Sequence, residues 1–437
     1  MKALTQWAVF GAAAFAISAI SFESVFAAQQ GVQRTSAAPT YPTRCVVATG
    51  SASMQGVSKE FARQMAIRDA LKQASMQTNL KVSSNQEVNN YTLTKDATRF
   101  TSNSKVSQYL IVSEGLQEVD FNKRFDDSGI EILDQKKLDE MQTYEVKMEV
   151  CLTEDPQACD NVPGNHLEPK LAIAKPITTD SQGAKDISNL LPGYQTELQR
   201  RLYAQGYRNM VMIDNVNLLD STQAISPNLS PDVLDPIREG TGAQYLLLTV
   251  IRSLSLHSDA PEMWNDVKRF YNLDVTPDTR FIETDSYIVD LYNYDTVMEK
   301  RLGFDVKGNV VVGRQRPFGT NAFFATDTGM VFNTLLDQAT TQAYDFMKCK
   351  PVESRIIDIR GGDYVIFLSN ESGAKVGDEL AVYHTFDRPV RYQGNDLGLD
   401  SEPSGFLKIK RIQSRFAVAE VLAKDGLIQI GDKVRSW

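Results

Sequence analysis

The sequence predicts a multidomain protein of mixed α+β and α/β class that ends in a small β-barrel. Three observations predict this fold. The N-terminal part combines one helical stripe with several alternating strands, the middle part alternates strands with helices, and the part after residue 350 shows only short strands. Strand–helix alternation is typical of α/β units, whereas many short strands between turns are typical of barrels. A chain of 437 residues suits two to four such domains.

The chain opens with the pattern of an export signal. Lys2 supplies a positive charge, residues 7–20 are mostly apolar, and Val25-Phe26-Ala27 has the small residues of a cleavage site. The apolar run is too short for a bilayer span, which needs about 20 apolar residues. We therefore predict a signal peptide at 1–27 and a soluble exported chain without a membrane span. It would begin with a flexible tail at 28–43, rich in Gln, Ser, Thr, Ala and Pro.

The N-terminal domain is predicted to be an α+β domain over 44–153. "RCVVATGSAS" indicates a first strand, and a stripe of Phe, Met, Ile, Leu and Ala indicates a helix over 57–77 with Ser58 as N-cap. "LKVSSNQEVNN", "KVSQYLIVSEGLQEVDF" and "YEVKMEVCL" indicate further antiparallel strands. The polar segment 126–140 indicates a solvated loop, and 154–165 a linker.

The middle domain, 166–349, is predicted to be an α/β unit on a mixed sheet. "KLAIAKPI" and "NMVMIDNV" indicate strands, and the long apolar run in "AQYLLLTVIRSLSL" indicates a central strand buried on both faces. Helices are predicted at 190–205, ended by Gly206, after Ser230-Pro231, and at 330–348. "SYIVDLYNYDTVMEKRLGFDV" indicates a hairpin that turns about 293–296.

The C-terminal domain, 350–437, is predicted to be a small closed barrel of the SH3-like kind. Six short strand-like runs follow one another, separated by Gly, Asn, Asp and Pro. Gly377-Asp378 and Gly431-Asp432 indicate turns, because Gly accepts a positive φ and Asp hydrogen-bonds the nearby backbone. The polar stretch 387–404 is predicted to be an exposed loop.

The four cysteines follow the export signal, so they are expected to form disulfides. Zinc is the alternative, but the chain has no C-x-x-C pair and its three His residues lie far from every Cys. The favoured pairing joins Cys45 to Cys151 across the N-terminal domain, and Cys159 to Cys349 at the two ends of the middle domain. A local Cys151–Cys159 bridge remains the alternative.

Composition and motifs exclude several classes of function. A net charge of −9 without a basic run argues against nucleic acid and anionic membranes as partners. The chain has no HExxH, G-x-S-x-G or Walker motif, and "GTGAQ" at 240–244 lacks the glycines of a dinucleotide turn. Asp259, Glu262 and Asp266 lack the spacing of a calcium loop. We therefore expect no catalytic residues, no cofactor and no metal site.

Two long loops with aromatic residues, 259–285 and 314–329, are the candidate binding features. Long loops of this kind often carry binding residues. The alternative is that the rings pack beneath their own loops. The candidate interface residues are Trp264, Phe270, Tyr271, Phe281, Phe318, Phe323 and Phe324.

Two stretches resemble the flagellar assembly protein T (FlgT) family. They are "GSAS…EFARQMAIRDALKQAS…KVSS" at 50–84 and "YVIFLSNESGAKVGDELAVYH" at 364–384, and the overall resemblance covers nearly all of the chain after the signal. It implies a periplasmic, non-catalytic component of the H ring around the basal body of a polar flagellum. The middle domain would resemble the N-terminal domain of TolB.

The resemblance also implies partners. The N-terminal domain would serve stator-ring assembly through MotX and MotY, the other domains would serve the outer ring, and copies would self-associate in a ring on the basal body. The alternative is a periplasmic TolB-like or lipoprotein-like binding or trafficking module unrelated to flagella.

Overall fold

The computed structural model describes residues 42–77, 80–89, 92–102, 105–117, 142–155, 159, 166–214, 230–257, 277–386, 391–392, 395–396 and 401–436. The predicted signal peptide, the loop at 126–140 and the three carboxylates weighed for calcium lie outside these ranges. Trp264, Phe270 and Tyr271 lie outside them as well. Within the described ranges, none of the helices combines the length and the apolar character that a membrane span requires.

The N-terminal unit is one helix on a three-stranded antiparallel sheet, as predicted. The strands are β1 (Thr43–Ser53), β4 (Lys105–Leu116) and β5 (Thr143–Thr153), in the order β1-β5-β4. Helix α1 (Lys59–Gln77) covers one face of this sheet. The Ser58 hydroxyl accepts a hydrogen bond from the Phe61 amide at 3.2 Å, so the predicted N-cap is confirmed. The alanines of α1 are fully buried at a four-residue spacing: Ala62, Ala66, Ala70 and Ala74.

A separate two-stranded antiparallel sheet follows α1. It consists of β2 (Leu80–Asn89) and β3 (Thr92–Ser102). The first strand was predicted, but the second was not. The sequence of β3, "TLTKDATRFTS", contains few apolar residues and no apolar alternation, which is the signal that predicts a half-buried strand.

The middle unit contains a mixed seven-stranded sheet. Its strands are β6 (Leu171–Ala174), β7 (Ile177–Thr178), β8 (Met210–Ile213), β9 (Tyr245–Ser253), β10 (Leu256–His257), β11 (Thr279–Asp290) and β12 (Asp295–Lys307). β6 pairs in parallel with β8 and β9, whereas β11 pairs antiparallel with β9 and β12. The predicted mixed sheet with a central β9 is therefore confirmed. The predicted hairpin is also present, with its turn between Asp290 and Asp295.

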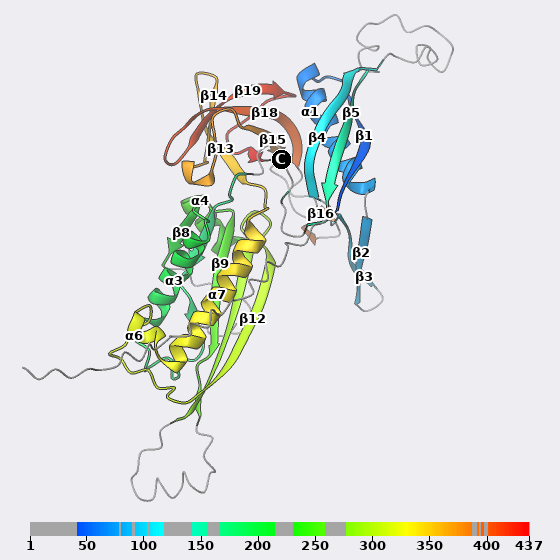
Figure 1. The fold of residues 1–437 in the computed structure, drawn as a ribbon. Helices are drawn as coiled ribbons and strands as arrows, with labels where there is room; N and C mark the ends of the chain where they lie inside the picture. Colours follow the sequence, from blue (N-terminus) through cyan, green and yellow to red (C-terminus); the bar gives the residue numbers. More distant parts are fainter. Residues whose placement is uncertain are drawn as a thin grey trace, which may run out of the picture. The chain divides into compact units, whose positions relative to one another are not determined.

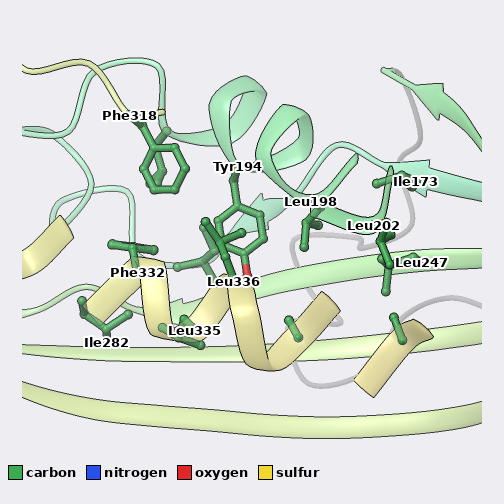
Figure 2. Close-up of a cluster of buried hydrophobic side chains, with 14 of the residues drawn as sticks. Ile173, Tyr194, Leu198, Leu202, Leu247, Ile282, Phe318, Phe332, Leu335 and Leu336 are labelled. Carbon is green, nitrogen blue, oxygen red and sulfur yellow. The ribbon is translucent and has the colours of Figure 1, made fainter. Parts of the chain in front are cut away.

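Helices cover both faces of this sheet. They are α3 (Leu190–Ala204), α4 (Pro231–Thr241), the short α6 (Asn321–Phe324) and α7 (Asp327–Met347). Leu247 packs in one core with α3 and α7, while its neighbours Leu246 and Leu248 pack in another with α4. Because successive strand residues point to opposite faces, α4 lies across the sheet from α3 and α7. In Figure 1, α7 and α3 run along the sheet, and Figure 2 shows the core between them.

The C-terminal unit is a closed six-stranded barrel, as predicted. Its strands are β13 (Glu353–Arg360), β14 (Asp363–Ile366), β15 (Glu379–Thr385), β18 (Ser401–Ile412), β19 (Ala417–Lys424) and β20 (Lys433–Arg435). The stretch 387–404, predicted as a loop, contains β16 (Arg391–Tyr392), β17 (Asn395–Asp396) and the start of β18. A two-residue strand is too short to show a period in the sequence.

Both predicted Gly-Asp turns are confirmed. Gly377 has φ +99° and Gly431 has φ +97°. The Asp378 carboxylate accepts a hydrogen bond from the Lys375 amide at 2.8 Å, and Asp432 accepts one from Gln429 at 2.7 Å. The same two carboxylates each contact a histidine ring nitrogen, at 3.0 Å for His166–Asp378 and 2.9 Å for His384–Asp432. Two of the three histidines therefore hold turns.

The two disulfides are Cys45–Cys151 and Cys159–Cys349, which confirms the favoured pairing. Cys45 and Cys151 lie directly opposite each other on β1 and β5. The second bridge joins the segment after β5 to the residues that follow α7. The alternative Cys151–Cys159 bridge is excluded.

The barrel is tied to the middle unit by residues 242–244, which connect α4 to β9. The Gln244 side chain donates to the Pro351 carbonyl at 3.1 Å and accepts from the Glu353 amide at 2.8 Å. Gly242 has φ +65°, and a Cβ there would lie 2.4 Å from the Phe367 ring. "GTGAQ" is therefore a packed connection that requires glycine at its centre.

Candidate interaction surface

Helix α1 presents two faces to two different neighbours. Its alanine face packs on the β1-β5-β4 sheet, while Phe61 and Met65 pack against the barrel. The Phe61 and Phe406 rings lie 5.5 Å apart, and both side chains are buried. This aromatic contact joins the helix of the N-terminal unit to strand β18.

Polar contacts surround this aromatic pair. The Arg68 guanidinium donates to the Tyr383 hydroxyl at 2.7 Å and lies 5.1 Å from the centre of the Phe406 ring. Gln64 donates to Glu379 at 3.3 Å. Burial lowers the pKa of Arg68, and the Tyr383 hydroxyl opposes that shift. These residues form an internal joint of the chain and are not available to a partner.

The outer face of the β1-β5-β4 sheet is exposed and partly apolar. Val47 on β1 and Leu110 on β4 both lie opposite Glu149 on β5, so the three side chains share one face. Val47 is 53% exposed, Leu110 64% and Val112 57%. We call Val47, Leu110 and Val112 the outer sheet face.

Charged residues of β5 run through the middle of this face. Glu145, Lys147 and Glu149 alternate along the strand with the buried residues that face α1. The Cys45–Cys151 disulfide joins β1 to β5 beside Val47. The outer sheet face therefore combines apolar side chains at both edges with charges of both signs along the centre, on a covalently braced sheet.

The predicted interface aromatics have different positions. Phe318 and Phe323 are 1% and 0% exposed and belong to the core beneath α7, where Phe318 points toward Tyr194 and Phe332 (Figure 2). For these two rings the structure shows the alternative, packing beneath their own loop. Phe324 is partly buried under the Arg201 guanidinium, 5.6 Å from its ring. Among the candidates that the structure describes, Phe281 is the one exposed at the surface, at 37%, and its ring meets the His257 ring edge-on at 5.0 Å.

Sequence reasoning did not single out the outer sheet face, although a signal for it exists. The run Tyr109-Leu110-Ile111-Val112 is apolar at four successive positions of one strand. A strand with one solvated face should alternate instead. Two register shifts in β4, at Val106/Gln108 and Ile111/Ser113, add to the irregular pattern.

Among the residues that the structure describes, no group of three or more His, Cys, Asp and Glu side chains could hold a metal ion. One buried ion pair of the middle unit serves the fold. Arg280, fully buried on β11, donates to both carboxylate oxygens of Asp186 at 2.7 Å. Asp186 also accepts a hydrogen bond from the Val312 amide at 2.9 Å. This pair fixes the segment before α3 against the sheet.

These units define the class of the protein: a multidomain α+β chain with two disulfides, a closed β-barrel and an exposed apolar sheet face. Residues 44–119 match the family model described as "Flagellar assembly protein T, N-terminal domain". The match confirms the resemblance to the flagellar assembly protein T family over residues 44–119. The match spans β1, α1, β2, β3 and β4, and strands β1 and β4 of this region carry the outer sheet face.

Other comparisons give more distant likenesses. No curated protein matches the chain in sequence. The hypothetical protein CT253 from Chlamydia trachomatis is 13% identical over 42% of this chain and 98% of its own, with a TM-score of 0.29. The PelC dodecamer from Paraburkholderia phytofirmans is 10% identical over 43% and 95%, with a TM-score of 0.25. Lipoprotein GNA1162 from Neisseria meningitidis is 10% identical over 40% and 99%, with a TM-score of 0.23.

Proposed function

We propose that the protein is a periplasmic, non-catalytic component of the H ring of the flagellar basal body. The observation that carries this proposal is the match of residues 44–119 to the N-terminal domain of flagellar assembly protein T. The chain would enter the periplasm through the signal peptide at 1–27. Its middle unit would be the TolB-like domain and its barrel the SH3-like domain of that family.

The outer sheet face is the proposed contact for the stator-ring proteins MotX and MotY. It lies within the family-matched region, it is exposed, and the Cys45–Cys151 bridge braces it. Apolar side chains beside charges of both signs suit a protein partner better than an anionic polymer. The remaining units would support the outer ring, with copies repeating one head-to-tail contact around the basal body.

A deletion strain tests the ring assignment. Basal bodies purified from it should lack the outer ring in electron micrographs, and the cells should swim poorly. Intact rings with normal swimming would contradict the proposal. The TolB-like or lipoprotein-like binding module would then be the better description.

A surface variant tests the stator contact separately. The triple variant Val47→Ser, Leu110→Ser, Val112→Ser should keep the outer ring but lower the MotX and MotY recovered with basal bodies, measured by immunoblot. Met76→Ser is the matched control, because Met76 is an exposed apolar residue of the same unit at the end of α1. Equal recovery of MotX and MotY in both variants would contradict the proposed contact.

A further inference from the structure

The outer wall of the barrel holds a cavity of about 210 Å³ over strands β14 and β19. Its floor is formed by Val365 and Val418, which pair across the two strands. The residues on either side of them, Ile366 and Ala417, belong to the barrel core. Because successive residues alternate in direction, Val365 and Val418 point outward. They are nevertheless buried, since the walls of this cavity cover them.

The walls come from the neighbouring strands and one hairpin end. Arg411 on β18 lies opposite Val418 on β19. Arg360 lies opposite Asp363 at the end of the β13–β14 hairpin. Gln413 and Phe416 close the β18–β19 hairpin through a backbone hydrogen bond of 2.8 Å. The cavity is therefore apolar at its floor and along one wall, and its rim holds two arginines, Arg360 and Arg411, and one carboxylate, Asp363.

The cations at the rim are not neutralised equally. Asp363 is paired with Lys410 at 3.0 Å, and Lys410 also lies 3.5 Å from Glu420. Arg360 donates through Nε to Asp358 at 2.6 Å, and its terminal nitrogens have no hydrogen-bond partner within the described part of the chain. Arg411 has no ion-pair partner among the residues that the structure describes. In a chain of net charge −9, the described residues thus place an arginine without an ion-pair partner beside an apolar hollow.

We propose that this cavity binds a carboxylate-bearing segment of a protein partner. Arg411 and the free side of Arg360 would hold the carboxylate, since guanidinium groups bind carboxylates in a bidentate geometry. The floor of Val365 and Val418 and the Phe416 ring would take an adjacent apolar side chain.

The size of the cavity decides the class of ligand. Small-molecule and cofactor sites span roughly 300–1,000 Å³, so about 210 Å³ suits one anchor side chain of a protein. The barrel is closed and offers no free strand edge for a peptide to join. The partner would therefore bind through its side chains, without backbone pairing to the barrel. Its carboxylate would determine which residue of the segment enters the cavity.

Binding of a defined acidic peptide to the full chain tests this proposal. The probe is an acetylated, amidated peptide Asp-Phe-Glu-Leu-Asp, compared by calorimetry with Asn-Phe-Gln-Leu-Asn. The acidic peptide should bind and the amide peptide should not. Binding should weaken as salt rises, because the pairing is exposed. Equal binding of the two peptides, or none of the acidic one, would overturn the proposal.

Single-charge variants locate the site. Arg411→Gln should weaken binding of the acidic peptide by about tenfold, the usual effect of losing one charge-assisted hydrogen bond. Arg316→Gln is the control, because it removes the same charge from an exposed position on the middle unit. Equal effects of the two variants would show non-specific attraction and overturn the site. If acetate bound as strongly as the peptide, the cavity would be a site for small anions, and the proposal of a protein ligand would be contradicted.

Discussion

The Asp285 carboxylate on β11 contacts three side chains of the middle unit, those of Arg252, Arg301 and Tyr287. Its side chain is fully buried, and it accepts hydrogen bonds from Arg301 at 2.7 and 2.8 Å and from Arg252 at 2.8 Å. The Tyr287 hydroxyl lies 3.2 Å away. Burial alone would raise the pKa of Asp285, but the hydrogen bonds from the two arginines outweigh it and lower the pKa below its ordinary value.

Asp285→Asn should lower the free energy of unfolding by about 3 kcal/mol near pH 7, because it leaves Arg252 without its buried anion. A carboxylate with a lowered native pKa stabilises the fold above its unfolded pKa of about 3.9 and loses that effect as the pH falls toward the native pKa. The difference in the free energy of unfolding between the wild type and Asp285→Asn should therefore decrease as the pH falls from 5 to 3. Urea midpoints across this range measure it.

Asp305→Asn is the control for this prediction. Asp305 is exposed on β12 of the same hairpin. This variant should leave the urea midpoint within the small range of surface substitutions at every pH. If the difference in unfolding free energy between the wild type and Asp285→Asn stayed constant with pH, the lowered pKa of Asp285 would be contradicted.

Strand β1 and helix α1 approach each other at Gly50. A Cβ at Gly50 would lie 2.1 Å from the Ala66 carbonyl oxygen and 2.2 Å from the Ala70 amide nitrogen. Both atoms belong to the backbone of α1, so no side-chain rotation can relieve the contact. The small residues of α1 and this glycine together set the spacing between helix and sheet.

Gly50→Ala should therefore lower the free energy of unfolding by about 1–3 kcal/mol, as overpacking usually does. Gly115→Ala on β4 of the same sheet is the matched control, because a Cβ there meets no atom within 4 Å. It should leave the thermal midpoint unchanged or slightly raised, since alanine restricts the unfolded chain. Equal losses in both variants would contradict a specific contact between β1 and α1.

Most of these elements could be predicted from the sequence, because each contains a local signal. Apolar stripes predict α1, α3 and α7, and the Gly-Asp pairs predict two turns of the barrel. The predicted elements are wrong or missing where the sequence has no hydrophobic pattern to define them. Helix α7 begins at Asp327, before the predicted position 330, because the Thr326 hydroxyl accepts a hydrogen bond from the Gly329 amide at 3.0 Å. Strand β3 is polar, so no alternation reveals it.

The joint between α1 and the barrel could not be predicted from the sequence. Gln64 contacts Glu379 and Arg68 contacts Tyr383, each across 315 positions of the chain. Such contacts depend on how finished units pack, and no local pattern records that. The disulfide pairing, in contrast, could be predicted, because the cysteines lie at the ends of the predicted units and this restricts which of them can pair.

The Cys159–Cys349 bridge should stabilise the α1–barrel joint through its place in the chain. With the bridge, a short covalent path runs from β5 through Cys159 and Cys349 to β13. Without it, the path runs through the whole middle unit. A shorter tether raises the effective concentration of one surface at the other. Each disulfide also lowers the conformational entropy of the unfolded chain. For sequence separations of 106 and 190 residues, this raises the free energy of unfolding by up to roughly 5 kcal/mol per bridge.

The variants Cys159→Ser/Cys349→Ser and Cys45→Ser/Cys151→Ser separate these effects. In hydrogen exchange, loss of the Cys159–Cys349 bridge should reduce the protection of α1 and β15, whose side chains meet at the joint, while β1 and β5 stay protected. Loss of the Cys45–Cys151 bridge should instead reduce the protection of β1 and β5, the strands that it joins. The two closed loops do not overlap, so the losses in unfolding free energy should add in the quadruple variant. Unchanged exchange of α1 and β15 without the Cys159–Cys349 bridge would show that the joint is held by its own contacts, with no help from the tether.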